Sequence, residues 1–166
     1  MKAALDTNIL AYAEGVNGAS MGRAALDLID RLPQDSVVVP VQALGELFQV
    51  LVRKAGRTPA DARSAILGWR DAFALIVTSA TVMLAAADLA TRQFNLWDAV
   101  ILSAAAEADC RLLLSEDMQE GFIWRGVTIV NPFSRTPHPL LDALLRPVIQ
   151  TAVCALIPVA GNGGDL

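Results

Sequence analysis

Short apolar runs alternate with longer segments of helical periodicity along most of the chain. The runs are rich in leucine and β-branched residues, which is typical of strands that are buried on both faces of a sheet. Helical segments separate most of the runs, so neighbouring strands are expected to lie parallel. The predicted strands are 2–5, 36–39, 74–77, 110–115 and 126–130.

The segments between these runs carry helix signals. Ser20 precedes an apolar stripe spaced by three and four residues, and Pro40 stands where proline is tolerated, in the first turn of a helix that continues to about Lys54. Further helices are predicted over 59–72, from a Ser79 or Thr81 cap to about Arg92, and onward from Asp98. The predicted fold class is therefore α/β, with a parallel sheet of about five strands sandwiched by helices in three layers.

Residues 134–166 differ in composition from residues 1–133. Five of the eight prolines lie from Pro132 onward, and the chain ends in the glycine-rich sequence "AGNGGDL". Between them, apolar residues at helical spacing predict an amphipathic helix that is kinked or broken at Pro147. We expect one domain over 1–133 and a C-terminal extension that packs on this domain, on a second copy or on a partner.

Composition restricts the chemistry. The chain has 166 residues, of which 54% are hydrophobic, and this is enough for one domain with a proper core. No apolar run approaches a membrane span and no secretory signal pattern is present, so a cytoplasmic location is expected. Cys110 and Cys154 are expected to be core thiols, and the single histidine, His138, argues against a multi-histidine zinc site or a histidine-based triad. Any catalysis must therefore use carboxylates.

The net charge of -4 argues against a broad basic face that binds nucleic acid. This objection weakens if four acids are metal ligands, because 17 minus 4 acids would then balance the 13 lysines and arginines. A bound divalent cation would also reverse the local sign of the charge.

Four carboxylates follow predicted strands or open nearby helices. In an open parallel sheet the ligand crevice lies beyond the carboxyl ends of the strands, so acids at that edge are the ones of interest. Asp6 follows the first strand and Asp117 the fourth, Glu46 lies in the second turn of the helix after the second strand, and Asp98 opens the apolar helix.

Each acid also has an ordinary structural explanation. Asp6 fits a turn or a helix cap, and Asp117 fits a turn. Asp98 follows Asn95 by three residues, as in a capping box. Glu46 fits the solvated face of an amphipathic helix. These explanations stay open for each residue taken alone. The shared position of the four acids at one edge of the sheet favours a cluster. Its carboxylates would repel one another strongly unless a hard cation such as Mg²⁺ or Mn²⁺ were bound.

The chain resembles a PIN domain of the short kind found in VapC-type toxin ribonucleases of bacterial toxin–antitoxin pairs. The resemblance covers about residues 1–133 and is carried, in order, by "ALDTNILAY", "ALGELFQVLVRK", "NLWDAVILSAA" and "LLLSEDMQEG". It implies a PIN-like fold, one or two Mg²⁺ or Mn²⁺ ions and metal-assisted hydrolysis of RNA phosphodiester bonds. It also implies a small antitoxin partner, a homodimer and no membrane association.

The resemblance assigns a role to each candidate site residue. The four acids named above would act as metal ligands and catalytic groups. Two polar residues would orient the carboxylates or the attacking water, and three basic residues of the second motif region are candidate RNA phosphate contacts. The orienting residues are Asn8 and Ser115, and the basic residues are Arg53, Lys54 and Arg57.

Two other classes of phosphate-chemistry protein and one non-enzymatic function are alternatives to this one. Haloacid-dehalogenase-type phosphatases require Asp-x-Asp after the first strand and a later lysine, whereas this chain has Asp-Thr-Asn there and only Lys2 and Lys54. Response-regulator receivers require an acidic pair there and a lysine near the last strand, which is missing. A catalytically inactive PIN-like module that binds RNA or protein stays open as the alternative. The expected mark of such a module is the loss of one or more acids, and all four are present.

Overall fold

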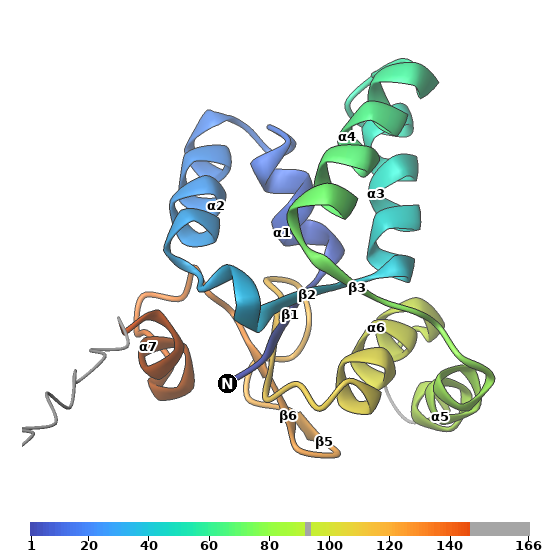
Figure 1. Ribbon diagram of the computed structural model, residues 1–166, viewed down its shortest axis with the longest axis vertical. Coiled ribbons are helices and arrows are strands. Elements are labelled where there is room, and N and C mark those ends of the chain that lie inside the picture. Colours follow the sequence, from blue (N-terminus) through green and yellow to red (C-terminus); the bar gives the residue numbers. More distant parts are fainter. Residues whose placement is uncertain (92–93, 147–166) are drawn as a thin grey trace, which may run out of the picture.

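The structure is a computed structural model that describes residues 1–91 and 94–146 (Figure 1). Within these residues six strands form one sheet in the order β3-β2-β1-β4-β6-β5. All neighbouring strands are parallel except β5 and β6, which are antiparallel. The predicted α/β class and parallel sheet are confirmed. The strands are β1 Ala3–Leu5, β2 Val37–Pro40, β3 Ala74–Ile76, β4 Leu112–Leu114, β5 Ile123–Trp124 and β6 Val127–Val130.

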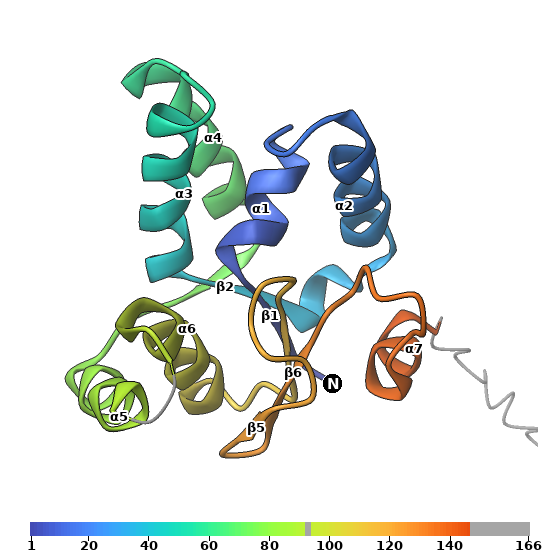
Figure 2. The same ribbon diagram turned by 180° about the vertical axis from the view of Figure 1, so that it is seen from behind.

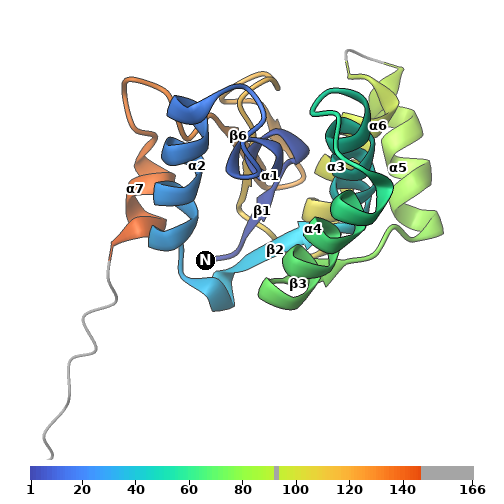
Figure 3. The same cartoon turned by 90° about the horizontal axis from the view of Figure 1, so that it is seen from above.

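Helices flank this sheet. Figures 1 and 2 show α1 to α4 above the strands, with α5 and α6 to one side of β5 and β6 and α7 to the other side. In Figure 3, α5 and α6 lie side by side next to α3. The helices are α1 Thr7–Ala13, α2 Ala19–Arg31, α3 Val41–Arg53, α4 Pro59–Ala72, α5 Ala80–Ala90, α6 Leu96–Glu107 and α7 Pro139–Leu145, with a short 3-10 turn at Gln34–Ser36.

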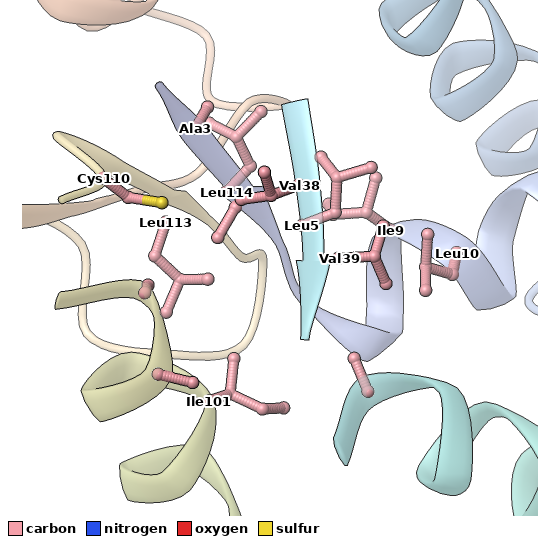
Figure 4. Packing of buried hydrophobic residues seen from close by; sticks show 14 of the residues in the cluster. Ala3, Leu5, Ile9, Leu10, Val38, Val39, Ile101, Cys110, Leu113 and Leu114 are labelled. Atoms are coloured by element: carbon pink, nitrogen blue, oxygen red, sulfur yellow. The ribbon is translucent and has the colours of Figure 1, made fainter. Parts of the chain in front are cut away.

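The core lies between the central strands and the helices that pack on them (Figure 4). All three residues of β1 and all three of β4 are fully buried, as the near-continuous apolar sequence of these runs predicts. Ile9 and Leu10 of α1 and Ile101 of α6 are equally buried in the same cluster. Both α1 and α6 are therefore anchored rigidly where they leave the carboxyl edge of the sheet.

Two helix starts differ from the prediction. Gly18, with φ of 90°, precedes α2 and gives no side-chain cap, so Ser20 lies inside the helix instead of capping it. Pro40 is the last residue of β2 and the residue before α3, not part of the first helical turn. The cap of α5 is Ser79, whose side chain accepts a hydrogen bond from the Val82 N–H, and not Thr81.

The sequence did not predict β5. This strand has two residues and pairs with β6 through a two-residue turn at Arg125 and Gly126, with φ of 46° and 87°. Positive φ at both central positions is the signature of a type I′ hairpin, which usually carries asparagine or aspartate before glycine. Arginine in that place removes the usual sequence signal.

The C-terminal extension is described only as far as residue 146. Its helix α7 follows His138, whose Nδ1 accepts a hydrogen bond from the Leu140 N–H, and it buries Leu141 and Leu144. The predicted kink at Pro147 and the rest of the amphipathic pattern lie outside the described residues. The division at residue 133 stays a prediction. No described helix has the length and apolarity needed to cross a membrane.

Candidate active site

The carboxyl ends of β1 and β4 meet at the centre of the sheet. These strands are neighbours, and the Asp6 N–H donates to the Leu114 carbonyl over 3.0 Å, which brings Asp6 next to Ser115. From β1 the chain continues through β2 and β3 in one direction, whereas β4 and β6 lie on the other side of β1. Such a switch point is where open parallel sheets form their ligand crevice.

Asp6 is buried, with 3% of its surface exposed, yet its carboxylate is hydrogen-bonded on both oxygens. Its Oδ1 accepts from the Thr7 N–H over 2.7 Å, so the predicted capping role at α1 is confirmed. Its Oδ2 accepts from Asn8 Nδ2 over 3.0 Å and from Ser115 Oγ over 2.7 Å. These contacts hold the side chain in one orientation toward the crevice.

Burial, together with the nearby charge of Asp117, raises the pKa of Asp6 to about 7. The hydrogen bonds from Ser115 and Thr7 act in the opposite direction and are too weak to offset the burial. A carboxyl group that is held by donors and still resists ionisation is typical of a functional site. A cation in the crevice would remove the cause of this resistance.

Asn8 connects the residues after β1 to those after β4. Its Nδ2 lies within 3.2 Å of Ser115 Oγ and 2.5 Å of Asp117 Oδ1, besides its contact with Asp6. Its Oδ1 accepts from the Glu116 N–H over 3.3 Å. Asn8 and Ser115 therefore contact two of the four candidate acids directly, as expected of orienting residues.

Asp98 lies in the first turn of α6, where the predicted helix capping by the Asn95 and Asp98 pair is confirmed, although the bond back from Asp98 goes to the Asn95 side chain and not to its backbone N–H. Asn95 Oδ1 accepts from the N–H groups of Trp97 and Asp98 over 2.9 and 3.0 Å, and Asn95 Nδ2 donates back to the Asp98 carboxylate. Burial raises the pKa of Asp98 to about 6, and the charges of Asp117 and Glu46 contribute to the same shift. Capping and membership of an acidic cluster therefore coexist in this residue.

Glu46 is half-buried on the side of α3 that faces α1. Its Oε2 accepts from Thr7 Oγ1 over 3.2 Å, and its Oε1 accepts from Gln42 Nε2 over 3.1 Å. The explanation of Glu46 as part of a solvated helix face does not describe this environment. Thr7 and Gln42 were missed by the sequence reasoning, although Gln42 stands four residues before Glu46, at the spacing of helical neighbours.

All four candidate acids line one pocket of about 250 Å³. Among the described residues, no three acid, histidine or cysteine side chains are arranged to enclose a single ion. This is compatible with Mg²⁺, which keeps several waters and is bound through one or two carboxylates together with substrate phosphate. An all-oxygen donor set without histidine also suits Mg²⁺ or Mn²⁺ better than zinc. The residues present therefore fit such an ion.

The three candidate phosphate contacts have different surroundings. Lys54 lines the acidic pocket, whereas the exposed Arg53 is not part of its lining. Arg57 forms an ion pair with Glu14, with 2.6 Å between Nη1 and Oε2, and also donates to the Glu14 carbonyl. Glu14 further accepts from Trp69 Nε1 over 2.9 Å. Lys54 is thus the basic candidate placed to meet a phosphate in the pocket, and Arg57 joins the loop between α3 and α4 to the end of α1.

The fold and the site define a parallel α/β domain with a carboxylate pocket at the switch point of its sheet. The PIN domain family model matches residues 3–119, and the chain belongs to this family. The match includes the four acids together with Asn8 and Ser115. A search of curated proteins gave no match.

Solved structures of similar fold support the same architecture. VapC20 from Mycobacterium tuberculosis, described as a sarcin-ricin loop cleaving toxin, is 18% identical with a TM-score of 0.59, over 70% of this chain and 92% of that one. A toxin–antitoxin complex from Klebsiella pneumoniae is 22% identical with a TM-score of 0.59, over 80% and 98%. VapBC2 from Rickettsia felis, bound to a promoter DNA fragment, is 18% identical with a TM-score of 0.57, over 78% and 97%.

Proposed function

We propose that this protein is a Mg²⁺- or Mn²⁺-dependent endoribonuclease and the toxin of a toxin–antitoxin pair. The observation that supports this most is the single pocket lined by Asp6, Glu46, Asp98 and Asp117 at the switch point of the sheet. An inactive PIN-like binding module would have no need to keep four acids together, because burial and then the neighbouring charges disfavour their ionised forms and raise the pKa values of Asp6 and Asp98.

The four acids would hold one or two ions, which when bound supply an activated water and neutralise charge on the phosphate. Ser115 and Asn8 keep Asp6 and Asp117 in fixed orientations. Thr7 and Gln42 hold the two oxygens of Glu46 in the same way. Lys54 would bind a phosphate of the RNA at the pocket wall. The rigid anchoring of α1 and α6 in the core keeps the carboxylates in place while the substrate is bound.

Cleavage of structured RNA by the purified protein tests the ribonuclease assignment. We expect cleavage in the presence of Mg²⁺ or Mn²⁺, complete loss on addition of EDTA, and recovery when the metal is restored in excess. Gel analysis of end-labelled RNAs measures the cut sites, and heat-denatured protein serves as the control. Cleavage that persists in EDTA would contradict the proposed metal dependence, and metal binding without cleavage of any RNA would favour the binding module.

The toxin assignment is supported by the fold shared with a toxin that cleaves the sarcin-ricin loop and with toxin–antitoxin complexes. Expression of the protein alone is expected to arrest bacterial growth, and co-expression of a small protein encoded beside it is expected to relieve the arrest. Colony counts after induction measure both effects, with Asp6→Asn as the control that should not arrest growth. Unimpaired growth at a confirmed level of soluble wild-type protein would contradict the toxin assignment. We further propose that structured RNA is the substrate and that the small protein encoded beside the toxin is its antitoxin. We also propose that the toxin forms a homodimer.

A further inference from the structure

Helix α1 holds three consecutive residues of the segment that follows β4. Asn8 contacts Ser115 Oγ and Asp117 Oδ1 through its amide nitrogen, and its amide oxygen accepts from the Glu116 N–H. Within the segment, Ser115 Oγ lies 3.1 Å from Asp117 Oδ1 and also accepts from the Met118 N–H over 3.3 Å. The orientation of Asp117 thus depends on how firmly this short segment is held against α1.

A second residue of α1 contacts the same segment. Tyr12 stands four residues after Asn8, so the two side chains lie on one face of the helix. The Tyr12 hydroxyl donates to Glu116 Oε2 over 2.8 Å. The Tyr12 side chain is buried and its ring packs at a tilt against Phe133, with 6.0 Å between the ring centroids. A phenol held in this way has little freedom to leave Glu116.

The neighbouring acids Glu116 and Asp117 have different surroundings, and Tyr12 contacts Glu116. Asp117 lines the acidic pocket, and Glu116 does not. Burial raises the pKa of Tyr12 to about 12, and the hydrogen bond to Glu116 raises it as well, so the hydroxyl stays a donor at neutral pH. Among the described residues, Tyr12 is the side-chain donor that the structure gives to the Glu116 carboxylate.

We propose that Tyr12 is a positioning residue whose hydroxyl, through Glu116, holds residues 115–117 against α1 and thereby fixes Asp117 for metal binding. This inference rests on the proposed function, because it concerns the same site. Without this contact, the segment after β4 loses one of the bonds that hold it against α1, and Asp117 can take other orientations. Residues that orient a metal ligand in this indirect way change metal affinity by roughly ten-fold or more when removed.

Four variants separate this role from simpler ones. Tyr12→Phe removes the hydroxyl and keeps the ring against Phe133, and Glu116→Ala removes the acceptor. Glu116→Gln keeps an oxygen that can accept from Tyr12. Glu120→Ala removes an exposed acid from the same loop and is the matched control. Each is compared with the wild-type chain by calorimetric Mn²⁺ titration, and by hydrogen exchange of residues 115–118 in the metal-free protein.

Tyr12→Phe and Glu116→Ala are expected to weaken Mn²⁺ binding by roughly ten-fold and to speed exchange in residues 115–118, while β1 and α6 exchange as in the wild type. A Tyr12→Phe/Glu116→Ala double variant is expected to bind Mn²⁺ no more weakly than either single variant, because both substitutions remove the same contact. Glu116→Gln is expected to recover most of the affinity lost in Glu116→Ala. Glu120→Ala should bind Mn²⁺ as the wild type does.

Three results would overturn the inference. Glu116→Gln as weak as Glu116→Ala would mean that the charge of Glu116 acts on the ion directly. Unchanged affinity and exchange in Tyr12→Phe would mean that the hydroxyl positions nothing. Faster exchange throughout the core would make Tyr12 a packing residue. If the wild type binds no Mn²⁺, the proposed function fails, whereas the exchange comparison still tests the Tyr12–Glu116 contact by itself.

Discussion

Asp98→Asn is expected to lower metal-dependent RNA cleavage by at least about a hundred-fold while leaving the protein folded. Loss of a group that only orients a ligand costs about 10 to 100-fold, so loss of a ligand carboxylate should reach or exceed the upper end of that range. Asparagine can still accept the hydrogen bond from Asn95 Nδ2, and the backbone caps supplied by Asn95 Oδ1 are untouched. The substitution therefore separates the capping role of Asp98 from its role in the pocket.

The measurement compares initial cleavage rates of wild type, Asp98→Asn and the control Asp30→Asn at saturating Mn²⁺, together with thermal melting of the metal-free proteins. Asp30 is an exposed acid of α2 outside the pocket, so its variant carries the same charge change without altering the site. A wild-type rate in Asp98→Asn would show that the carboxylate serves only as a helix cap. A large fall in melting temperature alongside the fall in cleavage rate would mean that the substitution disrupts folding.

The parts of the fold that local patterns specify could be predicted from the sequence. Fully buried strands such as β1 and β4 appear as continuous apolar runs, and the Asn95–Asp98 pair shows its capping geometry in its spacing. The position of the acids at one edge follows from the parallel sheet itself, because a residue after any such strand must lie at that edge.

The remaining features depend on contacts between segments that are distant in the chain. Glu46 carries the pattern of a solvated helix residue, and only the packing of α3 against α1 brings it to Thr7. Arg57 has the sequence context of a surface base, and its ion pair joins residues 43 positions apart. Tyr12 and Glu116 are separated by 104 positions. No local periodicity can indicate such pairs. The acids could be predicted from their positions, and Asn8 and Ser115 from the family resemblance, whereas Thr7 and Tyr12 could not.

The metal-free protein is expected to lose stability as the pH rises from about 4 to about 7. In the folded protein the pKa of Asp6 is about 7 and that of Asp98 is about 6, against an ordinary value of 3.8 for aspartate. The folded state therefore binds more protons than the unfolded state over this range, so the free energy of unfolding falls with pH and levels off above both folded pKa values. Asp6, which is fully buried, accounts for roughly 4 kcal/mol at pH 8 (about 3 pKa units), and the half-exposed Asp98 adds a smaller amount because solvent screens it.

Urea denaturation in EDTA at pH 5 and pH 8 measures this loss, and Asp6→Asn provides the test of its source. The variant loses hydrogen bonds at Asp6, which shifts its stability by a constant amount at every pH. The informative quantity is therefore the difference in the free energy of unfolding between pH 5 and pH 8, which should shrink to the share contributed by Asp98. Mn²⁺ at pH 8 should restore stability to the wild type by mass action and do so far less in Asp6→Asn. Wild-type stability that is constant or rises from pH 5 to pH 8 would mean that neither burial nor the neighbouring charges disfavour the ionised acids in the folded protein. The charge cluster would then provide no driving force for binding a cation, and the metal site would have to rest on geometry alone.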